Sequence, residues 1–433
     1  MRPVERKAFI IGLILITAAT PPFFIQLNEA TRALNTWKLL AKIGSLGATV
    51  LFVWQFLLGY RQAVARWLTP DYLWALRVHR LLGVGGFVLL LLHPTFITPY
   101  YLTKHGLRLF AGGLPPPLDV LVPLGLVALG LLGVIVLTST LLRSVMGRRA
   151  WYVTHLGAYL MLPLAFVHGY PIGSTLQGTG LRYGWQGLFV LTGAFYVLRI
   201  LARFGVFSAP YELADVRPVA RDVVELTLRP LGRRLQPAAG QFAFFRRGPR
   251  GSVRPFTVSR FDAETGRLSI TVKALGRSTR ALQTATPGER ILVDGPYGTF
   301  GRAALETDRH VVMLAGGIGI TPFLRIIDEL KRRPGREAFL FYGNQQEADI
   351  AHRQELEAAG HVDLIHVLSG VEEHATFEVG FITPDLLRSR LEEPPSRYEF
   401  LICGPPEMVA GLESDLRSEG VPRRQIRHEL FEY

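Results

Sequence analysis

The stretch RVHRLLGVGGFVLLLLHPTFITP, residues 77–99, decides how this chain folds. Its apolar run is long enough to cross a bilayer core about 30 Å thick, and few charges interrupt it. Similar runs fill the first 205 or so residues, whereas the remainder has the mixed composition of a soluble α/β protein. We therefore predict six spanning helices, at residues 9–27, 38–60, 77–99, 118–142, 151–170 and 184–204.

Two of these predicted spans carry a pair of histidines. His79 and His93 are fourteen residues apart, which corresponds to about 21 Å of helical rise and about 40° of rotation. His155 and His168, in the fifth span, are thirteen residues apart, a rise of about 19.5 Å. A straight helix would turn this second pair onto different faces, and we expect Pro163 to distort the helix and correct this.

Ionisable side chains inside a span are costly and usually face the bundle interior, so these histidines are functional candidates. Their spacing predicts two bis-imidazole sites, one from His79 and His155 and one from His93 and His168. Haem iron accepts two axial imidazoles, and such ligation leaves no open position, which favours electron transfer. A single histidine is better explained by a hydrogen bond to a neighbouring helix, but that does not explain a spacing repeated on two helices.

Basic residues concentrate in alternate loops, which predicts that both termini lie in the cytoplasm and that the chain crosses the cell membrane several times. The net charge of +13 has the same explanation. No basic stripe interleaved with aromatic residues indicates nucleic acid, so the expected partner is a lipid bilayer. The first span could instead be a signal peptide with small residues Ala18 and Ala19, but its apolar run is long and no clear cleavage triplet follows.

The remainder of the chain changes period twice. Residues 211–300 alternate polar and apolar positions between glycines and prolines, which predicts a small antiparallel barrel. From about residue 307, strands alternate with helices, which predicts a doubly wound parallel sheet. The predicted domains are a transmembrane domain (1–205), a barrel domain (206–305) and an α/β domain (306–433).

Two segments of the barrel suit a flavin dinucleotide. In RPFT, residues 254–257, the Arg254 guanidinium can fork onto a pyrophosphate, Phe256 can pack on the flavin, and Thr257 can hydrogen-bond near its N5. Residues 272–279 end with a glycine and hydroxyls at a predicted helix start, which suits a phosphate. Either segment alone could be a strand and a turn, but the two in this order favour FAD. The predicted FAD contacts are Arg254, Pro255, Phe256, Thr257, Lys273, Gly276, Ser278 and Thr279.

Two segments of the α/β domain suit a nicotinamide dinucleotide. The loop AGGIGITPF, residues 315–323, follows an apolar strand, and we expect Thr321 to cap the next helix with Pro322 at its first position. Cys403, the single cysteine, excludes an intrachain disulfide. It ends another apolar strand, where it could touch the nicotinamide or simply be a small buried residue. The predicted contacts are Gly316, Gly317, Gly319, Thr321, Pro322, Cys403, Gly404 and Pro405.

Together these motifs resemble the ferric reductase and NADPH oxidase superfamily, in particular its prokaryotic flavocytochrome b members, over nearly the whole chain. The histidine pairs, RPFT, DGPYG at 294–298 and GGIGITP at 316–322 each resemble a family motif. The resemblance implies a six-helix bundle binding two b-type haems, followed by a ferredoxin–NADP-reductase-like module. It also implies that a terminal aromatic residue shields the flavin. Phe431 is the better match and Tyr433 the alternative.

The implied activity is electron transfer from cytoplasmic NAD(P)H through FAD and two haems to an acceptor across the membrane. Oxygen, giving superoxide, is the first candidate acceptor, a ferric chelate the second, and a quinone or partner protein the third. The implied catalytic residues are Phe431, Cys403, Thr257 and Arg182, with Arg182 supplying positive charge near the outer haem. We expect activity without an obligatory regulatory subunit, since no calcium-binding loop is present.

Two departures from the family keep alternatives open. Oxygen-reducing members carry a further histidine one turn beyond the outer third-span ligand, where this chain has Ile97. Related domains often carry an arginine after the second nicotinamide-domain strand, where this chain has GNQQ at 343–346. NADPH, with Arg353 as a guanidinium for its 2′-phosphate, and NADH therefore both remain open.

Two other classes of protein remain as rivals. A non-catalytic haem protein would leave the flavin and nicotinamide motifs unexplained. A cation-conducting six-helix protein with a regulatory nucleotide domain predicts no Soret band.

Overall fold

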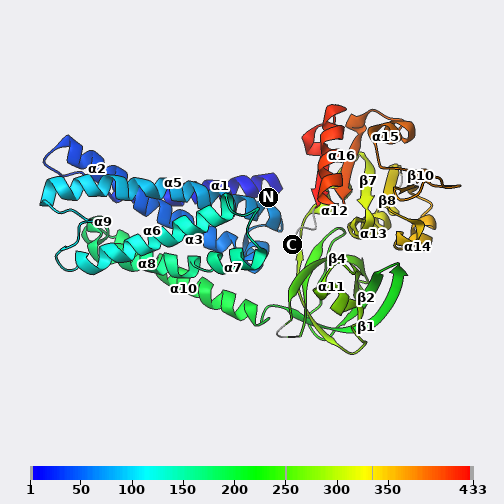
Figure 1. Ribbon diagram of the computed structural model, residues 1–433, viewed down its shortest axis with the longest axis horizontal. Helices are drawn as coiled ribbons and strands as arrows, with labels where there is room; N and C mark the ends of the chain where they lie inside the picture. The colour runs from blue at the N-terminus through cyan, green and yellow to red at the C-terminus, as the bar shows by residue number, and fades with distance from the viewer. Residues whose placement is uncertain (1–2, 249–250, 334, 430–433) are drawn as a thin grey trace. The chain divides into compact units, whose positions relative to one another are not determined.

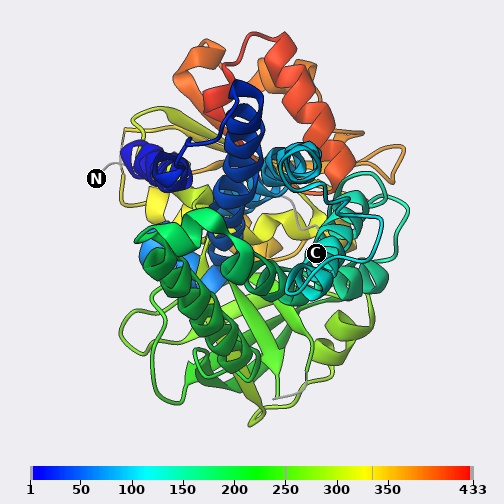
Figure 2. The same cartoon turned by 90° about the vertical axis from the view of Figure 1, so that its left-hand side faces the viewer.

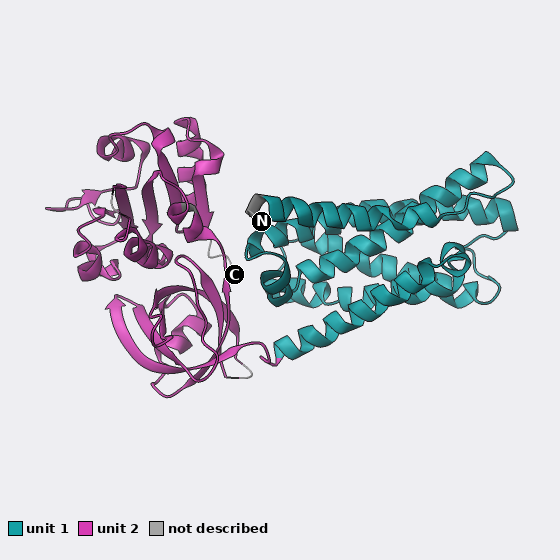
Figure 3. Ribbon diagram, turned by 180° about the vertical axis from the view of Figure 1, so that it is seen from behind, with its two compact units in different colours: residues 1–203 teal, residues 204–433 magenta. Residues whose placement is uncertain are grey.

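The computed structural model describes residues 3–248, 251–333 and 335–429. The chain divides into two compact units, residues 1–203 and 204–433 (Figure 3). The first unit is helical, and the second combines a barrel with a parallel sheet, so the predicted fold class is confirmed (Figure 1).

Six helical segments in the described part of unit 1 are long and apolar enough to cross a membrane, as predicted. Figure 2 looks along the length of this helical unit. Large exposed apolar side chains, such as Phe9, Leu81 and Val190, cover the outside of the unit, as expected where lipid is the solvent. The segments are Glu5–Phe24, Arg32–Leu58, Tyr72–His105, Leu118–Thr140, Arg148–Ile172 and Leu181–Arg203.

The third, fourth and sixth spans are continuous helices: α5 (Tyr72–His105), α6 (Leu118–Thr140) and α10 (Leu181–Arg203). The first span comprises α1 (Pro3–Ala19) and a 3-10 turn, η1 (Pro21–Phe24). Short helices in the connections are α4 (Arg61–Ala63), the π-helical η3 (Val64–Leu68) and α9 (Ser174–Gly178).

The second span is interrupted by a π-helical turn. It consists of α2 (Arg32–Lys42), the turn η2 (Ile43–Gly47) and α3 (Ala48–Leu58). A β-carbon added at Gly44 in this turn would meet the His93 backbone nitrogen at 2.9 Å. Glycine therefore lets the second and third spans touch beside a predicted haem ligand, and π turns are common at such sites.

The fifth span is interrupted directly after its first histidine. It consists of α7 (Arg148–His155) and α8 (Ala158–Ile172), and Pro163 lies inside α8. α8 continues through Pro163, and the fifth span is interrupted earlier, at residues 156–157, so the expected distortion at Pro163 stays a prediction. There the Gly157 backbone N–H bonds to the Thr154 carbonyl at 3.0 Å, a tighter turn that changes the angle between the two helical pieces.

The barrel of unit 2 is closed and has six antiparallel strands in the order β1-β2-β5-β4-β3-β6. Alternate side chains point inward and form one apolar core, which includes Leu226, Ile270 and Val293. The elements are β1 (Ala209–Ala220), β2 (Val223–Pro230), β3 (Phe242–Arg247), β4 (Val253–Phe261), β5 (Leu268–Lys273), α11 (Arg277–Gln283) and β6 (Arg290–Tyr297).

The parallel sheet of unit 2 has the strand order β10-β9-β8-β7-β11-β12. The chain order reverses between β7 and β11, and folds of this kind bind ligands at the carboxyl ends of strands at such a point. The strands are β7 (His310–Gly316), β8 (Ala338–Asn344), β9 (Asp363–Leu368), β10 (Glu378–Val379), β11 (Tyr398–Cys403) and β12 (Ile426–Glu429).

Helices cover both faces of this sheet (Figure 1). One core packs α13 and α14 against one face, and another packs α15 and α16 against the other. The remaining short helices are η4 (Gly317–Ile320), η5 (Glu347–Asp349), η6 (Pro395–Arg397) and η7 (Arg423–Gln425). The longer helices are α12 (Phe300–Leu305), α13 (Thr321–Leu330), α14 (Arg353–Glu357), α15 (Pro384–Arg390) and α16 (Pro406–Ser418).

A partly buried ionic network joins the barrel to the sheet. The Arg260 guanidinium of β4 pairs with Glu225 of β2 at 2.6 Å and also with Glu355 of α14. His352, beside α14, lies 3.0 Å from the Thr271 hydroxyl of β5. Burial alone would raise the pKa of Glu355, but hydrogen bonds from His352 and Arg260 lower it to about 2. The carboxylate is therefore stabilised in its charged form at the junction.

Replacing Glu355 with Gln should lower the free energy of unfolding by about 1 kcal/mol at neutral pH, since water screens a side chain that is 39% exposed. The folded pKa lies below the usual 4.5, so this contribution is present above about pH 4.5 and is lost as the pH falls toward about 2. Thermal unfolding of the full chain, followed by circular dichroism across this range, measures the difference. The exposed Glu373→Gln is the control, and a Glu355→Gln effect that does not change with pH would contradict the assignment.

Candidate functional site

The structure brings the four membrane histidines together in the two predicted pairs. The ring centroids of His79 and His155 are 6.2 Å apart, and those of His93 and His168 are 6.1 Å apart. Two iron–nitrogen bonds of about 2 Å, plus about 1.1 Å from each Nε2 to its ring centre, separate two axial imidazoles by about 6 Å. Each gap therefore fits one bis-imidazole iron.

The protein already engages the other ring nitrogen of each histidine. The His155 Nδ1 lies 3.3 Å from the Ser139 hydroxyl. A carbonyl oxygen only accepts, so an Nδ1 beside one carries the hydrogen, and Nε2 keeps the lone pair that a metal needs. Three Nδ1 atoms have such carbonyl partners: His79 with Gln55 at 2.8 Å, His93 with Ala41 at 3.2 Å and His168 with Leu121 at 2.6 Å.

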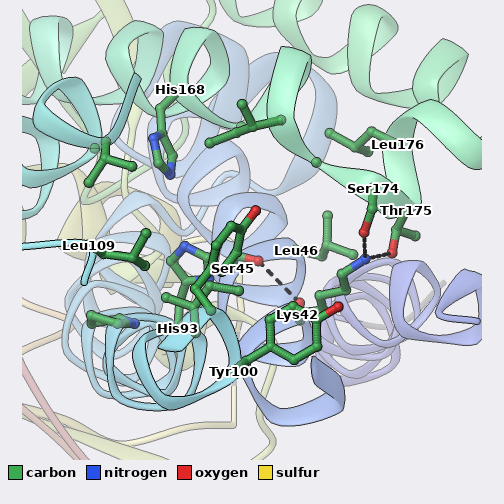
Figure 4. A pocket seen from close by; sticks show the side chains of 18 of the residues that line it. Lys42, Ser45, Leu46, His93, Tyr100, Leu109, His168, Ser174, Thr175 and Leu176 are labelled. Carbon is green, nitrogen blue, oxygen red and sulfur yellow. Dashed lines mark hydrogen bonds between the residues drawn. The ribbon is translucent and has the colours of Figure 1, made fainter. Parts of the chain in front are cut away.

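A cavity of about 550 Å³ surrounds the second pair, and His93 and His168 both point into it (Figure 4). This volume lies within the range of sites that hold organic ligands. A β-carbon added at Gly125 of α6 would come within 2.7 Å of the His168 ring, so glycine leaves room for that imidazole. The residues therefore fit a haem between α5 and α8.

Arg182 is not among the residues that line this cavity, and its role as a charge near the second pair stays a prediction. Its exposed guanidinium lies over the Tyr183 ring at 4.7 Å and donates to the Tyr183 hydroxyl at 2.7 Å. Such a position lets the cation stay hydrated at the start of α10. Ile97, one turn beyond His93, does line the cavity.

Sequence reasoning missed the polar residues at one end of the same cavity. Lys38, Lys42 and Lys104 line it, and so does Trp185 of α10. The two lysines of the second span offered a signal, because an ammonium group within a spanning helix is costly and usually functional. Trp185 offered none, because a tryptophan in an apolar helix is most simply a packing residue.

In the barrel, β4 presents the predicted flavin residues. Thr257 is 2% exposed, and its hydroxyl has no hydrogen-bond partner in the part of the chain that the structure describes. The half-buried Arg254 guanidinium forms no ion pair with the described residues. Phe256 packs against the barrel core through Phe245, at 6.0 Å between ring centroids. An unsatisfied buried hydroxyl and an unpaired cation on one strand fit a polar, anionic cofactor such as FAD.

The second predicted flavin segment is arranged differently from the expectation. The Thr279 hydroxyl accepts hydrogen bonds from the backbone N–H groups of Leu275 and Gly276, at 3.0 and 2.9 Å, and so closes its own turn. Ser278 accepts a bond from Ser252 at 3.1 Å. These hydroxyls stabilise the start of α11, because the turn itself would otherwise leave backbone donors unsatisfied.

The two predicted nicotinamide loops meet at the carboxyl ends of β7 and β11. A β-carbon at Gly319 would lie 2.1 Å from the Cys403 carbonyl oxygen, and one at Gly316 would lie 2.4 Å from the Met408 sulfur. Gly317 has φ +52°, which favours glycine. Glycine thus allows the backbone-to-backbone packing that builds this edge of the sheet.

Thr321 is not the helix cap that the sequence predicts. The 3-10 turn η4 leads directly into α13, so Ile320 is the cap residue and already has helical angles. Thr321 is the first helical residue, with its side chain buried, and Pro322 follows it. The helix therefore begins with backbone donors that no side chain caps.

Cys403 is buried, and burial together with the nearby Glu429 raises the pKa of its thiol well above the usual range. Burial therefore favours the neutral thiol over the thiolate. Glu429, which sequence reasoning missed, pairs with Cys403 across β12 and β11, and burial raises its pKa to about 8. Phe431 and Tyr433 lie outside the described residues.

Arg353, the candidate for a 2′-phosphate, is already engaged. Its guanidinium pairs with Glu357 at 2.7 Å and with Glu347, and it lies over the Phe377 ring at 5.0 Å. A phosphate would have to compete with two carboxylates for this cation.

Comparison with known proteins covers both units. The family described as "Ferric reductase like transmembrane component" matches residues 44–166, "Oxidoreductase FAD-binding domain" matches 210–301, and "Oxidoreductase NAD-binding domain" matches 313–414. Among solved structures, flavohemoglobin from Malassezia yamatoensis is similar over 93% of this chain and 99% of its own, at 19% identity and a TM-score of 0.49.

Curated relatives match the second unit. NADH-cytochrome b5 reductase 1 of Emericella nidulans is 34% identical over 229 residues, which are 48% of this chain and 69% of that protein. Its counterpart in Aspergillus oryzae is 33% identical over 231 residues, 49% of this chain and 74% of that protein. A reductase of this kind accounts for the second unit but not for residues 44–166. This chain carries a ferric reductase transmembrane component followed by FAD-binding and NAD-binding domains. It therefore belongs to the ferric reductase and NADPH oxidase superfamily of membrane-bound, NAD(P)H-dependent oxidoreductases.

Proposed function

We propose that this protein moves electrons across a membrane, from NADH on the cytoplasmic side to an acceptor on the other side, with FAD and two b-type haems as cofactors. The observation that carries the proposal is the pairing of four imidazoles at centroid separations of 6.2 and 6.1 Å. FAD can accept two electrons as a hydride and release them singly, and bis-imidazole haems carry single electrons.

The histidines and their partners would hold each haem rigidly. The imidazoles of His79, His155, His93 and His168 would hold the two haems, which would supply one-electron transfer when bound. The carbonyls of Gln55, Ala41 and Leu121 fix the tautomer and the ring orientation, as second-shell partners of metal-bound histidines do. The distribution of basic loops supports placing the second unit in the cytoplasm and the bundle in the cell membrane.

In the second unit, Arg254 would pair with the FAD pyrophosphate and the Thr257 hydroxyl would satisfy a polar atom of the flavin. The glycines of the 316–319 loop would admit the dinucleotide backbone at the carboxyl edge of β7. Phe431 remains our candidate for the aromatic residue that shields the flavin, with Tyr433 as the alternative.

NADH is our preferred donor. Arg353 is held by two carboxylates, and GNQQ at 343–346 offers no guanidinium for a 2′-phosphate. The similar fungal proteins are named as NADH-dependent reductases, which agrees with this choice.

Oxygen, giving superoxide, is the first acceptor to test, because the superfamily resemblance favours it. A ferric chelate is the second candidate, supported by the cationic end of the cavity beside His93 and His168. Reduction of external cytochrome c that superoxide dismutase abolishes would identify oxygen, and direct reduction of ferric citrate without oxygen would identify the chelate.

Purified protein should contain two haems per chain, and His79→Ala or His93→Ala should each lower this to one, because each removes one axial ligand. Pyridine haemochrome content per protein measures the ratio. His428→Gln, a change of an exposed histidine in unit 2, should keep both haems. Colourless wild-type protein, or two haems retained in both alanine variants, would refute the proposed function.

Replacing Gly319 with Ala should raise the KM for NADH about tenfold or more, because the added β-carbon displaces the loop from the Cys403 carbonyl and weakens dinucleotide binding. Steady-state NADH oxidation measures this, with haem and FAD content expected to stay unchanged. Gly360→Ala is the matched control, because nothing lies within 4 Å of its added β-carbon. Equal KM values in the two variants would show that the loop does not contact the dinucleotide.

The wild type should use NADH with a kcat/KM about tenfold or more above that for NADPH, because Arg353 is neutralised by Glu347 and Glu357. The double variant Glu347→Gln, Glu357→Gln frees this guanidinium and should raise kcat/KM for NADPH while leaving that for NADH unchanged. If NADPH is already the better substrate of the wild type, another cation must bind its 2′-phosphate.

A further inference from the structure

The cavity beside His93 and His168 has one strongly cationic end. There the Glu29 carboxylate accepts from two ammonium groups, Lys38 at 2.6 Å and Lys104 at 2.7 Å. Lys42 donates to the Ser174 hydroxyl at 2.6 Å and also to Thr175 (Figure 4). In the described part of the chain, Lys42 forms no ion pair. We call these three lysines with Glu29, Ser174 and Thr175 the lysine end of the cavity.

The charges at the lysine end do not balance. Three ammonium groups face one carboxylate, which leaves two positive charges. Burial alone would raise the pKa of Glu29, but hydrogen bonds from Lys104, Lys38 and Tyr100 lower it to about 2, so this carboxylate is already ionised and fully used. The side chains of Lys38 and Glu29 are only 8% and 7% exposed. The two charges left unpaired are shared with Lys42, which is half-buried, and Lys104, whose side chain is 36% exposed. An anionic ligand in the cavity would compensate them.

A second, independent group in the same cavity also lacks an acceptor. Trp185 is 5% exposed, and its indole N–H has no hydrogen-bond partner among the described residues. Its ring lies against Gly169, next to His168, where an added β-carbon would be 3.7 Å from it. The Ser174 and Thr175 hydroxyls accept from Lys42 and still have O–H groups to donate. The cavity thus holds an indole N–H without an acceptor among the described residues and two hydroxyls that can still donate.

We propose that the lysine end binds carboxylate groups, with Lys42 as the principal cation. The inference rests on the proposed function, because His93 and His168 share this cavity. Two sources offer the same chemistry: the two propionates of a haem held by these histidines, or a free polycarboxylate that carries ferric iron as electron acceptor. Two carboxylates would balance the two unpaired charges in either case.

The test uses the full chain with His79→Ala, which leaves only the His93–His168 site, and compares Lys42 with Lys42→Met. Apoprotein is titrated with haem and with haem dimethyl ester, whose propionates are uncharged. The haem-loaded protein is then titrated with citrate while the haem spectrum is recorded. Arg108→Gln is the matched control, since it removes an exposed cation just beyond α5 that does not line the cavity.

If the propionates are the ligand, haem should bind about tenfold or more tightly than its ester, Lys42→Met should remove most of that preference, and citrate should have no effect. If a free polycarboxylate is the ligand, haem and ester should bind alike. Citrate should then shift the spectrum saturably, with an affinity that Lys42→Met weakens about tenfold. Lys42→Arg keeps the charge and should resemble the wild type in both cases.

The inference is overturned if neither the ester preference nor the citrate response depends on Lys42, or if Arg108→Gln changes them equally. Should Lys42→Met not fold, Lys104→Met makes the same test at a half-exposed cation of the same cluster. Wild-type protein without haem would instead refute the proposed function. Wild-type protein with two haems and no dependence on either lysine would refute this inference alone.

Discussion

An imidazole buried in a membrane bundle must satisfy two ring nitrogens, and this constraint organises the first unit. Backbone carbonyls accept hydrogen bonds from the Nδ1 atoms of His79, His93 and His168. The Nδ1 atom of His155 lies beside the Ser139 hydroxyl. Among the described residues no hydrogen bond to these Nε2 atoms is formed, and the two rings of each pair lie about 6 Å apart. In a medium without water, that arrangement is costly unless something between the rings accepts both lone pairs, and an iron does so.

The helices are shaped to meet this constraint. The π turn 43–47 brings Gly44 against the His93 backbone, and its neighbour Ala41 supplies the carbonyl for that ring. On a straight helix, a spacing of thirteen residues would turn His155 and His168 onto different faces. The break at residues 156–157 lets both histidines face α5, where each pairs with a different histidine. Irregular backbone is expensive inside a membrane, and here it lies beside the ligand positions, where its cost has a functional reason.

The sequence predicted what depends on pattern and spacing. The spans, the histidine pairs, the barrel and the doubly wound sheet all follow from periodicity or motif. It did not predict where side chains point. Arg182 turns outward to Tyr183, Thr279 closes its own turn, and Lys42 reaches Ser174 across 132 positions of sequence. Those directions depend on tertiary packing, which no local pattern encodes.

Buried polar groups without a hydrogen-bond partner therefore indicate the position of a ligand more directly than sequence motifs do. A buried donor left without a partner costs about 1–3 kcal/mol, so folding alone does not favour it. The Thr257 hydroxyl and the Trp185 N–H are such groups, and each lies among residues that independently fit a cofactor or a ligand. A motif such as RPFT indicates the class of ligand. An unsatisfied hydroxyl within that motif indicates which protein atom the ligand must contact. The same reasoning applies to Lys42, because within the described chain this half-buried cation donates to hydroxyls and forms no ion pair.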